Sequence, residues 1–324
     1  MIASEKGGRG AEEHRGRSAI LDLQVEQAMR RLLALENVHA VSRSSWISGK
    51  RLHYLDAGSG DAMILLHGAG GGSANWYRLM GPLSRQFRVI AIDLPGFGLS
   101  ESIEPVAPLG GQVATIIAEF LADLGVTPIH LIATSFGGLV ALRLAPMVDA
   151  RSIVLLDSAG LWPEASISLK LACIPLVQRL GLKQTRRGAR WALRHVLVTR
   201  RLPPDHEAAL AEYIFASAAR GDTRSLARAY ALFGSMRGQA EVLSAAELRA
   251  LAPRLAIIWG EKDRFLPAPR GRCAAVLAVG AQLRIIPGVG HSPNWEAPDK
   301  VLEMILEFLS SQIDEGMDEQ EKLE

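Results

Sequence analysis

The sequence has few of the features that mark disulfide-rich, membrane-spanning or nucleic-acid-binding proteins. Its 324 residues include only two cysteines, Cys173 and Cys273, which lie 100 positions apart. This spacing does not suit a metal site and predicts two buried thiols rather than a disulfide, as in a reducing cytoplasm. No apolar run reaches the length of a transmembrane helix. The 36 basic and 34 acidic residues leave a formal charge of +2, which argues against a nucleic-acid partner.

The composition is that of a globular protein. Apolar residues make up 48% and charged residues 22% of the chain, so a large buried core is expected and global disorder is not. The chain is longer than an average domain, but α/β folds of this size often form one core with an insertion.

Both ends of the chain are rich in charge. The first twenty residues contain no apolar segment of the signal-peptide type, and residues 1–17 are expected to be disordered. The segment that follows has apolar residues at helical spacing, which predicts an amphipathic helix packed on the core, with a dimer or membrane contact as the alternative. These residues are Leu21, Val25, Met29 and Leu32. We assign residues 1–40 to an N-terminal extension and residues 313–324, with six acids among the last eleven positions, to a solvated acidic tail.

Short apolar runs bounded by Gly, Pro and Asp begin near residue 45. The first two flank Ser48-Gly49, which predicts a β-hairpin. Later runs are AMILLHG, FRVIAIDLPG, IHLIATS, SIVLLDSAG, RLAIIWGEKD and AQLRIIPGVGH. Several are separated by helix-length amphipathic segments, which predicts an α/β fold with a parallel sheet covered on both faces. In such sheets, functional residues gather beyond the carboxyl ends of the strands.

The alternation stops between Gly160 and about Leu251, where we predict helices and no strand. We therefore expect a helical cap over residues 161–249, inserted into an α/β core made of residues 41–160 and 250–312. Tryptophans on or beside the cap are candidate pocket residues, although most aromatic residues at helical spacing simply pack a helix onto the core. These candidates are Trp76, Trp162, Trp191 and Trp295. Arg186, Arg190 and Arg194 recur every fourth residue and predict a solvated face, with an anion site or a membrane contact as alternatives.

The stretch HLIATSFGGLVALRLA predicts a buried strand, a sharp turn at Ser135 and a helix. A serine on such a turn is exposed above the sheet as a nucleophile, provided that the positions two before and two after it are small. Gly137 meets this condition, and Ala133 adds a single methyl group. The alternative is that Ser135 merely caps a helix.

A nucleophilic serine needs a base and a group that orients the base. Two of the eight histidines, His67 and His291, follow predicted strands, and we expect His291 to be the base because Gly288 and Gly290 let its loop reach over the sheet. For the orienting acid we prefer Asp263 to Glu261 beside it. Asp157 is the reserve candidate. The order Ser135, Asp263, His291 is that of the α/β-hydrolases.

The glycine-rich loop LLHGAGGGSANW follows another strand. The backbone N–H groups of Ala69 and Phe136 are our candidates for stabilising an oxyanion. Gly68, Gly70 and Asp93 mimic a dinucleotide-binding motif, but Ser73 stands at the third glycine position, and Asp93 lies 25 residues after Gly68 rather than about 20. A nucleotide site would also leave the serine, aspartate and histidine unexplained.

These motifs together resemble the α/β-hydrolase superfamily, in its cap-bearing branch of esterases and carbon–carbon bond hydrolases. The resemblance covers roughly residues 45–310 and includes DLPGFGLS at residues 93–100 and GHSPNWEAP around His291. It implies a mostly parallel eight-stranded sheet with helices on both faces, a Ser–His–Asp triad and an inserted helical cap. A triad mechanism needs no metal or organic cofactor, and no Cys/His cluster in the sequence suggests one.

The predicted function is hydrolysis of carboxylic esters of small to medium apolar substrates. Epoxide hydrolases and haloalkane dehalogenases are disfavoured because they have an aspartate where this chain has Ser135; perhydrolases share the triad. Carbon–carbon hydrolases of the meta-cleavage-product type remain the alternative, although they often have tryptophan where this chain has Ser292. A receptor for small molecules on the same fold is the non-enzymatic alternative. We expect a cytoplasmic protein that acts on a small molecule, without a membrane contact; a homodimer is an open alternative.

Overall fold

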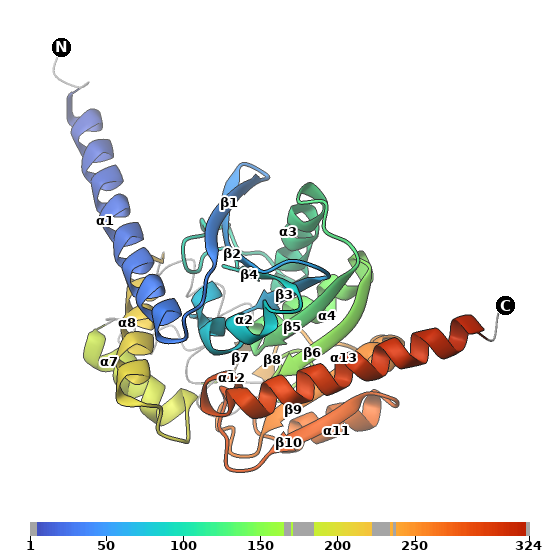
Figure 1. Cartoon of the computed structure of the whole chain (residues 1–324). Coiled ribbons are helices and arrows are strands. Elements are labelled where there is room, and N and C mark those ends of the chain that lie inside the picture. The colour runs from blue at the N-terminus through green and yellow to red at the C-terminus, as the bar shows by residue number, and fades with distance from the viewer. Residues whose placement is uncertain (1–4, 165–169, 171–184, 222–233, 236–237, 322–324) are drawn as a thin grey trace.

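The computed structural model describes residues 5–164, 170, 185–221, 234–235 and 238–321 (Figure 1). An eight-stranded sheet of order β1-β2-β4-β3-β5-β6-β9-β10 forms its centre. The strands are β1 (Val41–Ile47), β2 (Lys50–Ala57), β3 (Ala62–Leu66), β4 (Arg88–Ile92), β5 (Ile129–Thr134), β6 (Ala150–Leu156), β9 (Leu255–Gly260) and β10 (Gln282–Ile286). Strands β1, β2 and β4 pair antiparallel, and every other neighbouring pair is parallel. The mostly parallel sheet expected from the sequence is confirmed.

The hairpin predicted at Ser48-Gly49 joins β1 to β2. Ser48 has φ 49° and Gly49 has φ 73°. Two successive residues with positive φ form the turn whose twist matches that of paired strands. The local sequence alone was therefore sufficient to place this hairpin.

Helices cover both faces of the sheet, because the side chains of each strand point alternately to opposite sides. Along β5, Leu131 and Ala133 pack in one apolar cluster and Ile132 packs in the other. The first cluster includes residues of α3 (Leu109–Asp123), α4 (Phe136–Leu144) and α10 (Ala245–Leu251). The second includes residues of α1 (Glu5–Leu35), α2 (Tyr77–Leu83), α8 (Pro204–Arg220) and α13 (Pro298–Glu321). The other α-helices among the described residues are α7 (Arg186–Ala192), α11 (Pro269–Leu277) and α12 (Pro293–Glu296).

The N-terminal extension is a helix that packs beside α8 (Figure 1). Val25, Met29 and Leu32 are buried, as their spacing predicted, and Leu21 is half-buried. Asp22 forms ion pairs with Arg220 of α8 at 2.6 Å and with Arg51 of β2 at 2.8 Å. The expected disorder of residues 1–17 is wrong from Glu5 onward, since each residue added to an established helix gains a backbone hydrogen bond.

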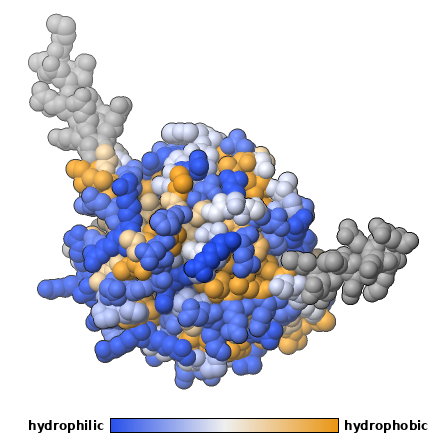
Figure 2. Space-filling model, in the orientation of Figure 1, coloured by the Kyte–Doolittle hydropathy of each residue, from blue (hydrophilic) through white to orange (hydrophobic). Residues whose placement is uncertain are grey.

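Apolar residues are also exposed where α1 leaves the body of the molecule. Ile20 is 60% exposed and Leu23 is 53% exposed. Figure 2 shows apolar atoms near this point and near α13, on a face that is otherwise mainly hydrophilic. Among the described residues we find no helix with the length and hydropathy of a membrane span.

The segment between β6 and β9, where we expect the cap, contains α7, a π-helical turn (Leu193–Leu197), α8 and α10. It also contains β7 (Gly234–Ser235) and β8 (Gly238–Gln239), a short ladder that the helical prediction missed. Two-residue strands have no periodicity that a sequence pattern could reveal. The three arginines predicted to form a solvated face are exposed; Arg186 pairs with Glu212 of α8, and both others pair with Glu207.

The expectation of two buried thiols can be compared with the structure at Cys273. Cys273 is a free thiol that is half-buried rather than buried, because α11 lies beside the edge strand β10. Cys173 lies outside the described residues.

The packing of α1 leads to a first prediction. Leu32→Ala should lower the free energy of unfolding by about 2–4 kcal/mol, because the Leu32 side chain is fully buried and its removal leaves a cavity. Ile20→Ala on the same helix is the matched control and should change it by less than about 0.5 kcal/mol. Urea denaturation of the three proteins measures both effects. Equal small losses for both variants would show that α1 is not docked as described.

Candidate active site

Ser135 forms the turn between β5 and α4. Its backbone has φ 52° and ψ −121°, a conformation that side-chain-bearing residues rarely adopt and that surrounding structure must enforce. The Ser135 N–H donates to the carbonyl of Leu156 on β6 at 3.1 Å, and the Ser135 carbonyl accepts from the N–H groups of Gly138 and Ala159. The turn is therefore held from the neighbouring strand as well as from its own helix.

Close packing requires glycine at two positions around this turn, one in the helix that follows Ser135 and one in the loop after β3. A Cβ atom on Gly137 would lie 2.3 Å from the carbonyl oxygen of Leu66 and 2.5 Å from that of His67. A Cβ atom on Gly68 would lie 3.0 Å from the Cβ atom of Ser135. Ala133 has its methyl group buried in an apolar cluster, so alanine is accommodated at the position where the motif usually has glycine.

Three side chains predicted to act together converge at this turn. His291 Nε2 lies 3.1 Å from Ser135 Oγ, and His291 Nδ1 lies 2.8 Å from Asp263 Oδ2. All three residues are buried. With the proton on Nδ1 shared with the carboxylate, Nε2 is available to accept the serine proton.

Asp263 is the acid that contacts His291. Its other oxygen, Oδ1, accepts the N–H groups of Phe265 at 2.7 Å and Leu266 at 2.9 Å, so the carboxylate faces three donors. Glu261 instead accepts the N–H of Gly288. Asp157 lies behind this arrangement, and its Oδ1 accepts the N–H of Gly260 at 3.0 Å.

A carboxylate that sequence reasoning missed holds the loop of His291. Glu296 Oε1 accepts the N–H of Gly290, and Glu296 Oε2 accepts those of Thr199 and Arg200 at 2.8 and 2.7 Å. Burial raises the pKa of Glu296, and these backbone donors oppose the rise. Glu296 therefore joins the histidine loop to the expected cap. The signal was present in GHSPNWEAP, where Glu296 ends a short helix that begins two residues after His291.

The other strand-end histidine, His67, is occupied elsewhere. Its Nδ1 donates to the carbonyl of Gly68 at 2.8 Å, and its Nε2 accepts the N–H of Leu94 at 2.9 Å. Burial lowers the pKa of His67, with Asp93 opposing, so the neutral ring is favoured. Because both nitrogens bind the backbone, His67 holds two loops together and is not placed as the base.

Asp93, the acid of the rejected nucleotide motif, is enclosed. His53 Nδ1 lies 2.7 Å from its carboxylate, which also accepts the N–H groups of Ser73 at 2.5 Å and Leu99 at 2.8 Å. Burial would raise the pKa of Asp93, but the interaction with His53 and these donors lowers it to about 2. The carboxylate is thus committed to internal partners and is not placed to bind a ribose.

A family model described as "Alpha/beta hydrolase family" matches residues 63–304, which contain the strands and side chains described above. The chain belongs to this family.

Three known proteins illustrate what this alpha/beta hydrolase is similar to. A 2-hydroxy-6-oxononadienedioate/2-hydroxy-6-oxononatrienedioate hydrolase of Comamonas testosteroni is 27% identical over 271 residues, which cover 82% of this chain and 93% of the relative. An esterase from Thermogutta terrifontis is 25% identical, with a TM-score of 0.69 and coverage of 84% and 99%. Carboxylesterase CesB from Bacillus subtilis is 21% identical, with a TM-score of 0.71 and coverage of 89% and 98%, and shows the shared fold.

The oxyanion candidates of this alpha/beta hydrolase lie on two segments that meet at the serine. Phe136 is the first residue of α4, directly after Ser135. Ala69 follows Gly68, the residue whose backbone approaches Ser135. Their role in stabilising an oxyanion remains a prediction.

The four candidate pocket tryptophans have different surroundings. Trp76 is fully buried, and Trp295 is buried with its Nε1 donating to the carbonyl of Asn75 at 2.8 Å. Trp162 lines a small hollow with Trp259. Trp191 is 61% exposed on α7, with its ring near that of His195, so we do not retain it as a pocket residue.

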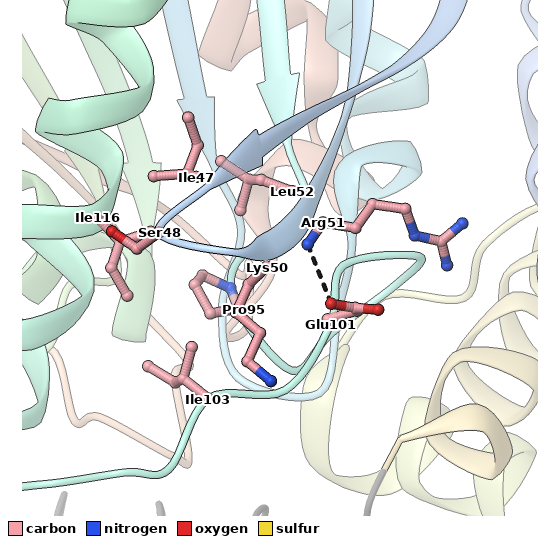
Figure 3. Close-up of a pocket in the computed structure, with 9 residues that line it drawn as sticks. All are labelled: Ile47, Ser48, Lys50, Arg51, Leu52, Pro95, Glu101, Ile103 and Ile116. Atoms are coloured by element: carbon pink, nitrogen blue, oxygen red, sulfur yellow. Dashed lines mark hydrogen bonds between the residues drawn. The ribbon is translucent and has the colours of Figure 1, made fainter.

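A separate hollow lies between the β1–β2 turn, α3 and the segment that follows β4 (Figure 3). Ile47, Leu52 and Ile103 give it an apolar lining, and the N–H of Arg51 donates to Glu101 at 3.1 Å. None of the three convergent side chains lines it. It is therefore distinct from the candidate active site.

The close packing at the serine turn leads to a second prediction. Gly137→Ala should destabilise the fold by about 1–3 kcal/mol, because the new methyl group would overlap two carbonyl oxygens. It should also slow the reaction of Ser135 with a fluorophosphonate probe. Ala133→Gly is the matched control and should still react. Denaturation curves and the rate of labelling measure the two effects, and wild-type behaviour of Gly137→Ala would contradict the described turn.

Proposed function

We propose that this alpha/beta hydrolase cleaves carboxylic esters through a Ser–His–Asp triad and an acyl-enzyme. The observation that carries the proposal is the chain of contacts from Ser135 Oγ to His291 Nε2 and from His291 Nδ1 to Asp263, at 3.1 and 2.8 Å. A serine hydroxyl becomes an effective nucleophile when an oriented base within hydrogen-bond distance accepts its proton.

The proposed reaction assigns one role to each side chain. His291 takes the proton of Ser135 as its oxygen attacks the ester carbonyl, and Asp263 holds the imidazole and stabilises its charged form. The N–H groups of Ala69 and Phe136 bind the oxyanion that develops on the carbonyl oxygen. His291 then protonates the leaving alcohol and afterwards activates the water that releases the acid.

An apolar acyl group fits the surroundings of the triad. The ring of Phe265 lies 5.0 Å from that of His291, measured between centroids, and the buried side chain of Leu266 follows in the same loop, where the Leu266 N–H donates to Asp263. We therefore propose small to medium apolar esters as the substrates. We further propose that residues 161–249 form a cap that selects among them.

Carbon–carbon bond hydrolysis is the second candidate function. The observation that favours it is the relative from Comamonas testosteroni, whose named substrates contain a 6-oxo group and no ester, so that their hydrolysis breaks a carbon–carbon bond. Both reactions require water or serine to add to a carbonyl carbon, and they differ in whether oxygen or carbon leaves. The same triad serves either reaction.

Turnover of p-nitrophenyl esters of graded acyl length tests the proposal. Wild-type protein should hydrolyse short and medium esters, and Ser135→Ala should lose about 10³-fold or more in kcat, because the nucleophile of the triad is removed. Ser84→Ala, which removes a hydroxyl group outside the site, is the matched control and should retain full activity.

The other outcomes separate the alternatives. Hydrolysis of a 2-hydroxy-6-oxo-dienoate that depends on Ser135, without ester turnover, would replace the proposal by carbon–carbon hydrolysis. Binding of a small molecule without serine-dependent turnover would indicate a receptor. Ester turnover that persists in Ser135→Ala would refute the assignment of the nucleophile.

A further inference from the structure

Asp157 is a buried acid that the proposed triad does not use. It follows β6 directly, its side chain is fully buried, and its φ is 44°. Positive φ in a residue other than glycine is uncommon, and such strain gathers at functional sites. The position of this carboxyl group behind the triad therefore requires a physical explanation.

Asp157 lies next to Asp263 because β6 and β9 are neighbours in the sheet. One carboxylate oxygen of Asp157, one of Asp263 and one ring nitrogen of His291 all lie within 4.8 Å of one another. A Cβ atom on Gly260, whose N–H binds Asp157, would lie 2.0 Å from the carbonyl oxygen of Gly290. The second acid therefore binds a residue that is packed tightly against the His291 loop and directly precedes the Asp263 loop.

The two carboxyl groups have unequal numbers of donors. Asp263 faces two backbone N–H groups and the ring N–H of His291. Asp157 receives one N–H, from Gly260, on Oδ1. Its Oδ2 is buried and, within the part of the chain that the structure describes, faces no N–H or O–H donor; the side chain interacts instead with the Asp263 carboxyl group.

Two buried carboxyl groups this close cannot both be ionised, so the pair shares one proton. The negative charge belongs on Asp263, where three donors stabilise it, and the proton belongs on Asp157. Burial raises the pKa of Asp157 well above its ordinary value, and the neighbouring charges of Asp263 and Glu296 act in the same direction.

We propose that Asp157 is a neutral carboxylic acid whose O–H donates to the Asp263 carboxylate and positions it for His291. The inference rests on the proposed triad and adds a positioning residue to it. The proton of Asp157 supplies the hydrogen bond that its Oδ2 otherwise lacks. It also gives Asp263 a fourth donor without adding a second negative charge beside His291.

Asp157→Asn is the sharpest variant, because an amide resembles a protonated carboxyl group in shape, in charge and in having a donor group on one side and an acceptor oxygen on the other. Asparagine also tolerates positive φ. We expect this variant to fold, with its oxygen accepting from Gly260 and its NH₂ donating to Asp263. Asp149→Asn, which removes an exposed carboxyl group, is the matched control.

The pH dependence of stability tests the protonation state without requiring turnover. An acid with a raised pKa in the folded protein contributes stability below its unfolded pKa, near 4, and this contribution is lost as pH rises toward the folded pKa. From pH 4 to 8, the unfolding equilibrium constant of Asp157→Asn should therefore fall relative to that of wild type, by as much as tenfold for each pH unit. Asp263, Glu296 and His291, which face Asp157, are present in both proteins, so the comparison varies only the group at position 157.

Infrared spectra provide a second measurement on the folded wild-type protein. At pH 7, the difference between wild type and Asp157→Asn should contain the C=O stretch of one protonated carboxyl group. Absence of that band, or a relative stability that moves in the opposite direction with pH, would overturn the proposal.

Activity then tests the positioning role. Asp157→Asn should keep kcat/KM for a p-nitrophenyl ester within about threefold, with an unchanged acid limb of the pH profile, because no charge is lost beside the base. Asp157→Ala should lose about tenfold, mainly in kcat, because one hydrogen bond to Asp263 is lost. An acid limb that shifts by about one pH unit in Asp157→Asn would show that an ionised Asp157 had been removed, and would overturn the proposal.

Absence of ester turnover in wild type would refute the proposed function, whereas the stability and infrared measurements would still decide the state of Asp157.

Discussion

The close approach of backbones at the carboxyl end of the sheet is the constraint on which the candidate site depends. Gly137 packs against the carbonyl oxygens at the end of β3, and Gly138 packs against Ser158 after β6. Neither space holds a side chain larger than hydrogen. This packing keeps Ser135 at a positive φ and directs its hydroxyl group toward His291. The energy stored in the strained turn is offset by the buried strands on both sides of it.

The loops around the serine are held by two carboxylates, the buried Asp93 and the half-buried Glu296, that each bind more than one segment. Asp93 accepts N–H groups from the loops after β3 and β4 and contacts His53 on β2. Glu296 joins the histidine loop to residues that precede α8. Carboxylates that are withdrawn from water require hydrogen-bond donors, because an unpaired buried charge would cost several kcal/mol. The same requirement gives each loop a single position relative to the sheet.

Local patterns in the sequence were sufficient for the hairpin at Ser48-Gly49, the strands of the sheet and the order of Ser135, Asp263 and His291. Each of these predictions depends on a turn residue or on an apolar run, and such features determine the structure of their own short segment. Partners brought together from distant segments could not be predicted in this way. Glu296 carried no distinguishing signal of its own and Asp93 stood out only as part of the rejected dinucleotide motif, because their donors lie on loops whose approach follows only from the assembled fold. The exposure of Trp191 likewise depends on which face of α7 packs against α8, and a seven-residue helix has too short a pattern to specify that face.

Strand order explains why the sequence offers Asp157 and Asp263 as alternative partners of His291, whereas the structure places both acids side by side. Asp157 and Asp263 are separated by the whole expected cap, so the chain presents them as alternative partners for His291. Pairing of β6 with β9 brings the ends of their strands together, and both carboxyl groups then enter one buried space. A space that excludes water stabilises one negative charge beside the histidine much better than two. The acid with more donors therefore bears the charge and binds His291, and the acid with fewer donors retains the proton, which is itself a donor to the first.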